Sequence, residues 1–84
     1  MTDRALTRGA IEEFVIDTMV KLGIDRGSIS LDVSFDDLGV DSLHVTELGQ
    51  AVDRELGVPV RATDLEETRS LREALDLICA KASL

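Results

Sequence analysis

Apolar residues recur at three- and four-residue spacing in three separate stretches of this 84-residue chain. Such spacing places them on one side of an α-helix, because a helix completes a turn every 3.6 residues or so. The first stretch predicts a helix over about 5–22, which Gly23 then ends. Its apolar stripe consists of Ile11, Phe14, Val15, Thr18, Met19 and Leu22.

The second stretch predicts a helix over about 42–56, ended by Gly57 and Pro59. Asp41 is well suited to cap its first turn. Four apolar residues of this helix are expected to face inward: Val45, Leu48, Val52 and Leu56.

The last stretch predicts a helix over about 71–82 with a clear start signal. Ser70 and Glu73 have the spacing of a capping box, in which each side chain satisfies a free backbone donor. A short helical turn over about 62–67 is indicated by propensity alone.

The connection from Gly23 to Asp41 is long for so small a domain. Within it Ile29, Leu31, Val33 and Phe35 alternate with polar residues, which on its own predicts a strand. A strand needs a partner, and the other candidate, 58–60, is too short and contains a proline. We therefore expect an extended, ordered loop that inserts alternate apolar side chains into a helical bundle.

Together these elements predict a single all-α domain over 1–84, a bundle of three main helices and one short one. The length suits one domain with a small core. Only Phe14 and Phe35 are aromatic, so the core must consist mainly of aliphatic residues and methionine.

The net charge of −8 is concentrated in one segment. Residues 27–53 contain no lysine or arginine but six acids: Asp32, Asp36, Asp37, Asp41, Glu47 and Asp53. This asymmetry favours basic protein partners over nucleic acids or anionic membranes, both of which repel acidic surfaces. The alternative is an acidic face that only keeps the protein soluble.

Cys79 is the only cysteine, which excludes a disulfide framework and a Cys/His metal cluster. The acidic loop also fails the calcium-loop pattern, since Leu43 stands where a bidentate glutamate is needed, so no metal site is expected. We find no signal-peptide pattern after Met1 and no stretch long enough to span a membrane, and expect a cytoplasmic monomer.

The chemically informative segment is Asp37-Leu38-Gly39-Val40-Asp41-Ser42-Leu43, which leads from the loop into the second helix. Gly39 allows a turn that other residues resist, and Ser42 falls in the first helical turn. A phosphate ester on Ser42 would meet free N–H groups and the positive end of the helix dipole. By position alone, however, Ser42 could equally be an ordinary polar residue of a first turn.

This segment resembles the phosphopantetheine attachment motif of acyl carrier proteins, in which a serine after Gly-x-Asp and before Leu takes the prosthetic group. Glu47 and Leu48 after the motif, the Gly-Val-x-Val exit over 57–60 and the order of the helices extend the resemblance over nearly the whole chain. It implies that a phosphopantetheinyl transferase attaches 4'-phosphopantetheine from coenzyme A to Ser42, beside Gly39, Asp41 and Leu43. The arm's thiol would then hold acyl groups as thioesters, and the protein would deliver them without being an enzyme.

The resemblance further implies docking to acyltransferase, ketosynthase or ligase-type enzymes with basic surfaces. The residues expected to meet them are Asp36, Asp37, Leu43, His44, Thr46, Glu47 and Gln50. Carriers of fatty acid synthesis usually have an acid at the position of His44 and several apolar residues on this helix face. Here only Leu43 is apolar, which favours polyketide or other specialised-metabolite assembly over fatty acid synthesis.

Two alternatives stay open. A peptidyl or aminoacyl carrier of nonribosomal synthesis would share the arm and the fold, although such carriers usually have a second glycine where this chain has Val40. The other alternative is a helical interaction module that carries no arm and binds partners through its acidic face alone. His44 itself is either a helix residue without a role or a partner contact whose charge changes near neutral pH.

Overall fold

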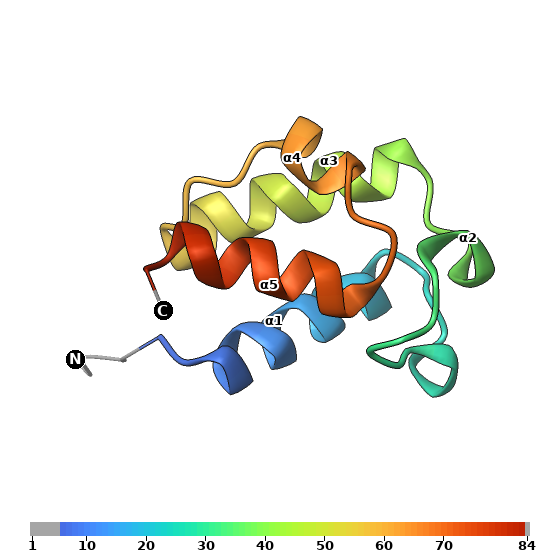
Figure 1. Cartoon of the computed structure of the whole chain (residues 1–84). Helices are drawn as coiled ribbons and strands as arrows, with labels where there is room; N and C mark the ends of the chain where they lie inside the picture. The colour runs from blue at the N-terminus through green and yellow to red at the C-terminus, as the bar shows by residue number, and fades with distance from the viewer. Residues whose placement is uncertain (1–5, 84) are drawn as a thin grey trace.

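The computed structural model describes residues 6–83, and in this part of the chain the regular structure is helical (Figure 1). Three longer helices, α1, α3 and α5, are accompanied by two short ones, α2 and α4. Their bounds are α1 Arg8–Lys21, α2 Phe35–Leu38, α3 Ser42–Ala51, α4 Ala62–Glu66 and α5 Leu71–Lys81, with a 3-10 turn η1 Arg26–Ser28 and a π-helical segment η2 Val52–Leu56. The all-α prediction is confirmed.

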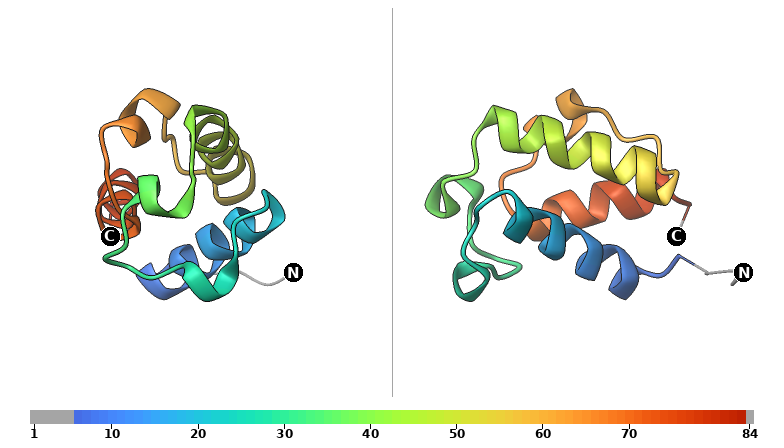
Figure 2. Two further views of the ribbon diagram at one scale, coloured as in Figure 1. Left: turned by 90° about the vertical axis from the view of Figure 1, so that its right-hand side faces the viewer. Right: turned by 180° about the vertical axis from the view of Figure 1, so that it is seen from behind.

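The three longer helices surround one core of buried side chains, and the end-on view in Figure 2 shows how these helices are arranged. Helix α1 contributes Ile11, Val15 and Met19, all from the predicted stripe. Helix α5 contributes Leu71, Ala74, Leu75, Ile78 and Cys79. Burying a large aliphatic side chain stabilises a fold by about 1.5–3 kcal/mol, so this shared core holds the bundle together.

Helix α1 begins at Arg8, with the Thr7 hydroxyl accepting a hydrogen bond from the Ala10 N–H at 3.1 Å. The predicted start at residue 5 lies outside the described residues. The second predicted helix matches its span of 42–56, but in two parts, since α3 passes into the π-helical turn η2. Gly57, with φ of 70°, ends that turn in the left-handed conformation that glycine tolerates best.

The connection between α1 and α3 corrects one prediction, because it is not extended throughout. The turn η1 and the helix α2 interrupt it. Helix α2 forms because the Ser34 hydroxyl caps it, accepting from the Asp37 N–H at 3.1 Å, and because Asp36 and Asp37 lie at its positive end. Most of the alternating apolar side chains nevertheless reach inward: Ile29 and Leu31 pack against the core and Phe35 is buried, whereas Val33 is half-buried outside the core cluster.

Two backbone hydrogen bonds fix this connection to the start of α5. The Phe35 N–H donates to the Arg69 carbonyl at 2.8 Å, and the Arg72 N–H donates to the Leu31 carbonyl at 2.9 Å. Between residues 6 and 83 there is no β-strand, only an isolated antiparallel bridge between Ser34 and Ser70. Three of the four alternating residues therefore insert into the bundle as predicted, Val33 being the exception, and the connection is held beside the start of α5.

Candidate functional site

The turn between α2 and α3 orients the start of α3. Gly39 has φ of 75°, and its N–H donates to the Asp36 carbonyl at 3.2 Å. The next N–H, of Val40, reaches back to the Phe35 carbonyl at 2.9 Å. This pair of bonds is the Schellman arrangement that ends many helices, and it depends on the left-handed residue. Gly39 thus has the conformational role that the sequence predicted.

Asp41 and His44 cap α3 reciprocally. The Asp41 carboxylate accepts from the His44 N–H at 3.0 Å, while the Asp41 N–H donates to His44 Nδ1 at 3.2 Å. His44 Nδ1 also lies 3.0 Å from the Asp41 carboxylate oxygen, so the ring faces both polar groups of the cap. The pKa of Asp41 is lowered, chiefly because the His44 backbone N–H donates to its carboxylate.

The capping role of His44 was not predicted from the sequence. The signal was present as Asp-x-x-His, which has the spacing of a capping box with histidine in place of glutamate or glutamine. His44 is therefore not a helix residue without a role. Because Nδ1 faces the cap, only the other ring nitrogen can serve a partner.

Ser42 is the first residue of α3 and is exposed. Its carbonyl accepts from the Thr46 hydroxyl at 2.9 Å, whereas its own hydroxyl makes no hydrogen bond within residues 6–83. A hollow of about 390 Å³ adjoins it, with Val40, Val45 and Leu65 among its lining residues. An exposed, uncommitted hydroxyl at a helix start beside a hollow fits a long phosphate-linked arm.

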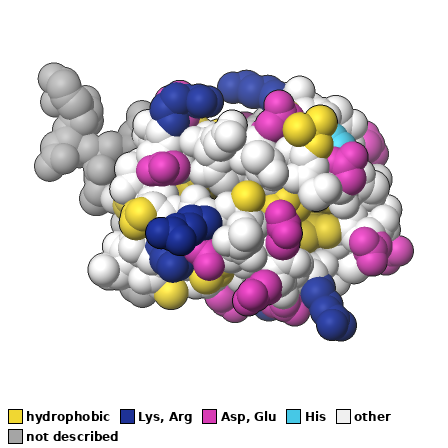
Figure 3. Space-filling model, turned by 90° about the horizontal axis from the view of Figure 1, so that it is seen from above, with side chains coloured by type: hydrophobic (Ala, Val, Ile, Leu, Met, Phe, Trp, Pro, Cys, Tyr) yellow, Lys and Arg dark blue, Asp and Glu magenta, His cyan; other side chains and the backbone are white. Residues whose placement is uncertain are grey.

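The residues predicted to meet partners divide between α2 and α3. Asp36, Asp37 and Glu47 are exposed, and Figure 3 shows acidic side chains around the histidine on the upper face. Leu43 is 65% exposed and is the one large hydrophobic residue so exposed in the described part. Each of these residues is placed where a partner could reach it.

The polar face of α3 is less uniform than the sequence suggested. Gln50 is exposed, but Thr46 is only half-exposed and directs its hydroxyl to the Ser42 carbonyl. Thr46 therefore supports the first turn of α3 and has no free donor to offer a partner.

Residues 6–83 contain no group of three His, Cys, Asp or Glu side chains that could hold a metal ion. None of their helices is long and apolar enough to cross a membrane.

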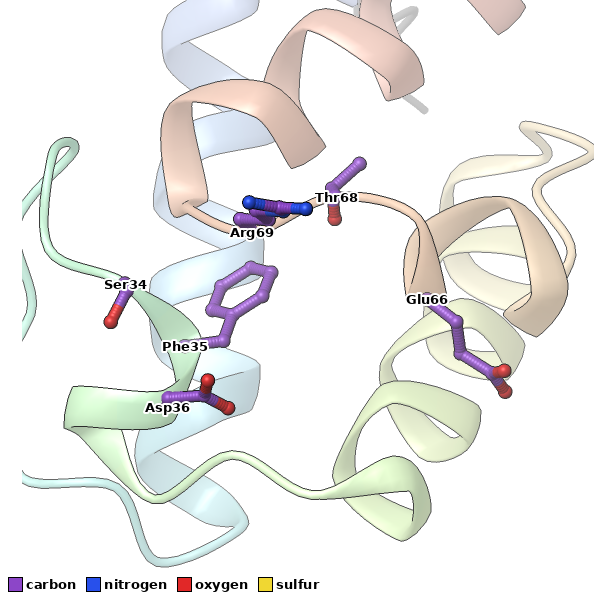
Figure 4. A pocket seen from close by; sticks show the side chains of 6 residues that line it. All are labelled: Ser34, Phe35, Asp36, Glu66, Thr68 and Arg69. Atoms are coloured by element: carbon purple, nitrogen blue, oxygen red, sulfur yellow. The ribbon is translucent and has the colours of Figure 1, made fainter.

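A second hollow of about 540 Å³ continues from the one beside Ser42 (Figure 4). Apart from Asp36, its lining residues were not predicted as site residues, because they come from separate elements: Ser34, Phe35, Asp36, Glu66, Thr68 and Arg69. No spacing pattern joins them in the sequence. The hydrogen bond from Phe35 to Arg69 brings α2 and the segment before α5 together.

Comparison with known proteins places this site in a class. The family described as phosphopantetheine attachment site matches residues 19–78, which include the whole segment from α2 to α4. The chain therefore belongs to the phosphopantetheine-binding carrier proteins, specifically to the acyl carrier protein family.

Three proteins similar to this chain are themselves acyl carrier proteins. The chain is 33% identical over 75 residues to an acyl carrier protein of Petrotoga mobilis, covering 88% of this chain and 85% of the relative. It is 35% identical over 69 residues to one of Solidesulfovibrio magneticus, covering 81% and 85%. It is also 39% identical over 56 residues to the granaticin polyketide synthase acyl carrier protein of Streptomyces violaceoruber, covering 67% and 66%.

Family membership settles the general function. The chain has acyl carrier function with phosphopantetheine as its prosthetic group, it serves biosynthetic enzymes, and it is not itself an enzyme.

Proposed function

We propose that Ser42 carries the phosphopantetheine arm and that the protein delivers acyl intermediates in polyketide or related specialised-metabolite assembly. The observation that carries the first part is the geometry of Ser42, an exposed and unbonded hydroxyl at the start of a capped helix beside a hollow. Two serines of the preceding connection have engaged hydroxyls: that of Ser34 caps α2, and that of Ser28 donates to the Asp25 carboxylate.

When bound, the arm supplies a thiol that holds the cargo as a thioester. The chain's own residues position it. Asp41 and His44 fix the first turn of α3 and so hold in place the backbone that carries Ser42. The free N–H groups of that turn favour the negative charge of a phosphate ester. In this proposal, the residues that adjoin the bound phosphopantetheine are Gly39, Asp41 and Leu43.

The assignment to a specialised pathway rests on the docking face of α3. Leu43 is its one strongly exposed large hydrophobic residue within the described residues, and Gln50 adds a polar group two turns away. The likeness to the granaticin polyketide synthase carrier supports this branch.

The proposed partners are a phosphopantetheinyl transferase and enzymes of the acyltransferase, ketosynthase or ligase type. Exposed Asp36, Asp37 and Glu47 would attract their basic surfaces. Leu43 would supply the apolar contact at the centre of the encounter. A cytoplasmic location and a monomeric state remain predictions.

A charging assay tests the branch of metabolism. The protein is first given its arm from coenzyme A, then offered either malonyl-coenzyme A with a polyketide malonyltransferase or amino acids with ATP and adenylating enzymes. We expect the intact mass to rise by one malonyl group in the first reaction only. Charging by amino acids alone would assign it to nonribosomal synthesis, and failure to accept an arm at all would overturn the carrier proposal itself.

A further inference from the structure

The hollow beside Ser42 and the hollow beside Arg69 form one groove. They share four lining residues: Phe35, Asp36, Glu66 and Thr68. At one end lie Ser42 and Val45, and at the other lies Arg69. Cargo tethered to Ser42 would therefore meet a surface that leads to a guanidinium.

Helices α3 and α4 pack closely beside the groove. A Cβ atom on Gly49 would lie 3.5 Å from Leu65 Cδ1 and 3.6 Å from the Ala62 backbone nitrogen, so the two helices are already in contact there. Leu65 is 1% exposed and fills the interface.

The far half of this groove is polar. Phe35 is the one apolar residue among its six lining residues, and its ring lies beside the Arg69 side chain in Figure 4. A saturated acyl chain would bury little apolar surface in this half of the groove. Groups that accept hydrogen bonds would find a guanidinium, which has five N–H donors.

Arg69 has a fixed backbone and an unengaged side chain. Its carbonyl accepts from Phe35, and its N–H donates to the Glu73 carboxylate at 3.1 Å. Its guanidinium makes no hydrogen bond or ion pair with residues 6–83. Five other basic residues there are paired with acids: Arg8, Arg26, Arg54, Arg72 and Lys81.

The neighbouring charges narrow the choice of ligand. Asp36 and Glu66 line the same groove, although the Glu66 carboxylate is directed away from Arg69 (Figure 4). With Asp41 at the Ser42 end, three carboxylates against one guanidinium make the groove negative, which disfavours a free carboxylate on the cargo. Neutral carbonyl or hydroxyl oxygens accept from a guanidinium without that repulsion.

We propose that Arg69 is a specificity-determining residue that binds the oxygens of 3-oxo or 3-hydroxy acyl groups on the arm. This inference rests on the proposed attachment at Ser42. It predicts that the protein distinguishes oxygenated from saturated cargo of equal length by holding the former along the groove.

The test compares protein loaded from 3-oxohexanoyl-coenzyme A with protein loaded from hexanoyl-coenzyme A by a phosphopantetheinyl transferase. Intact mass first verifies each load. Amide and side-chain NMR shifts of Phe35, Thr68 and Arg69 are then compared between the two cargoes. We expect the oxygenated cargo to shift these signals more, and Arg69→Gln to reduce the difference to none.

Arg61→Gln is the matched control, because Arg61 is also exposed and unpaired within residues 6–83 but lines neither hollow. It should leave the difference intact. Equal shifts for the two cargoes, or a difference that survives Arg69→Gln in a folded variant, would overturn the role of Arg69 alone. A protein that takes no load fails at the mass measurement and contradicts the attachment at Ser42 instead.

Discussion

Asp41 and His44 hold each other across the first turn of α3, each using its side chain to satisfy the other's backbone N–H, at 3.0 and 3.2 Å. Ser42, the proposed attachment point, lies between these two residues in the sequence. Any loosening of the cap would let the proposed attachment point move. The pair therefore affects both the stability of the fold and the position of the proposed arm.

The first prediction concerns this cap. His44→Ala leaves the Asp41 N–H without its acceptor and should lower the free energy of unfolding by about 0.5–1.5 kcal/mol, the net worth of one hydrogen bond. His44→Gln should recover most of the loss, because glutamine serves at this position of a capping box. Urea denaturation followed by circular dichroism measures both. Equal stability of the alanine variant and the native chain would contradict the cap.

The second prediction contrasts two glycines. Gly39 has φ of 75°, so Gly39→Ala should cost about 1–2 kcal/mol of stability. Gly49 lies inside α3, and an added Cβ would meet its neighbours at ordinary contact distances. Gly49→Ala should therefore stabilise the fold by about 0.5–1 kcal/mol. Denaturant midpoints should move in opposite directions, and movement in the same direction would show that one local conformation is wrong.

The third prediction concerns acid. The pKa of Asp32 is lowered by the hydrogen bond and charge of Arg72, whose Nε lies 2.8 Å away. A lowered folded pKa gives stability that is present above the unfolded value, about 3.9, and is lost as the pH falls through the folded value.

The stability that Asp41 contributes depends on pH in the same direction, because the His44 N–H lowers the pKa of Asp41. Denaturation measured from about pH 6 down to about pH 2 should show stability falling, with a shallower fall in Asp32→Asn and in Asp41→Asn. Variants that follow the native acid profile without change would disprove the contribution of these two carboxylates.

The fourth prediction tests the acidic docking surface. Reversing Asp36, Asp37 and Glu47 to lysine should slow the reaction with a phosphopantetheinyl transferase about tenfold at low salt, and less at high salt. The measurement is kcat/KM across a salt series. A control with the same charge change elsewhere reverses the exposed acids Glu13, Asp53 and Glu55. If the control slows the reaction equally, only net charge matters and the surface is merely solubilising.

The helices were predictable because their apolar stripes are local signals. Val45 and Leu48 face inward at the spacing that a helix requires, and Ser70 begins α5 as its capping position indicated. Helix α2 was not predicted, because the alternation through Phe35 masks a four-residue helix whose only signals are the Ser34 cap and two acids.

The candidate site was predictable where it is contiguous in sequence. Gly39, Asp41 and Ser42 occupy the turn, cap and first helical residue that the motif indicated. Arg69 could not be found in that way, because it reaches the groove only through the hydrogen bond between its carbonyl and Phe35. Long-range pairing of this kind leaves no periodic trace in the sequence.

The most direct test of the account is to locate the arm. The chain is incubated with coenzyme A, magnesium and a broad-specificity phosphopantetheinyl transferase, digested, and analysed by tandem mass spectrometry. We predict one phosphopantetheine on Ser42, absent from Ser42→Ala and retained in Ser30→Ala, a variant of another exposed serine. An arm on any other residue, or an unmodified native chain with several transferases, would contradict the central claim.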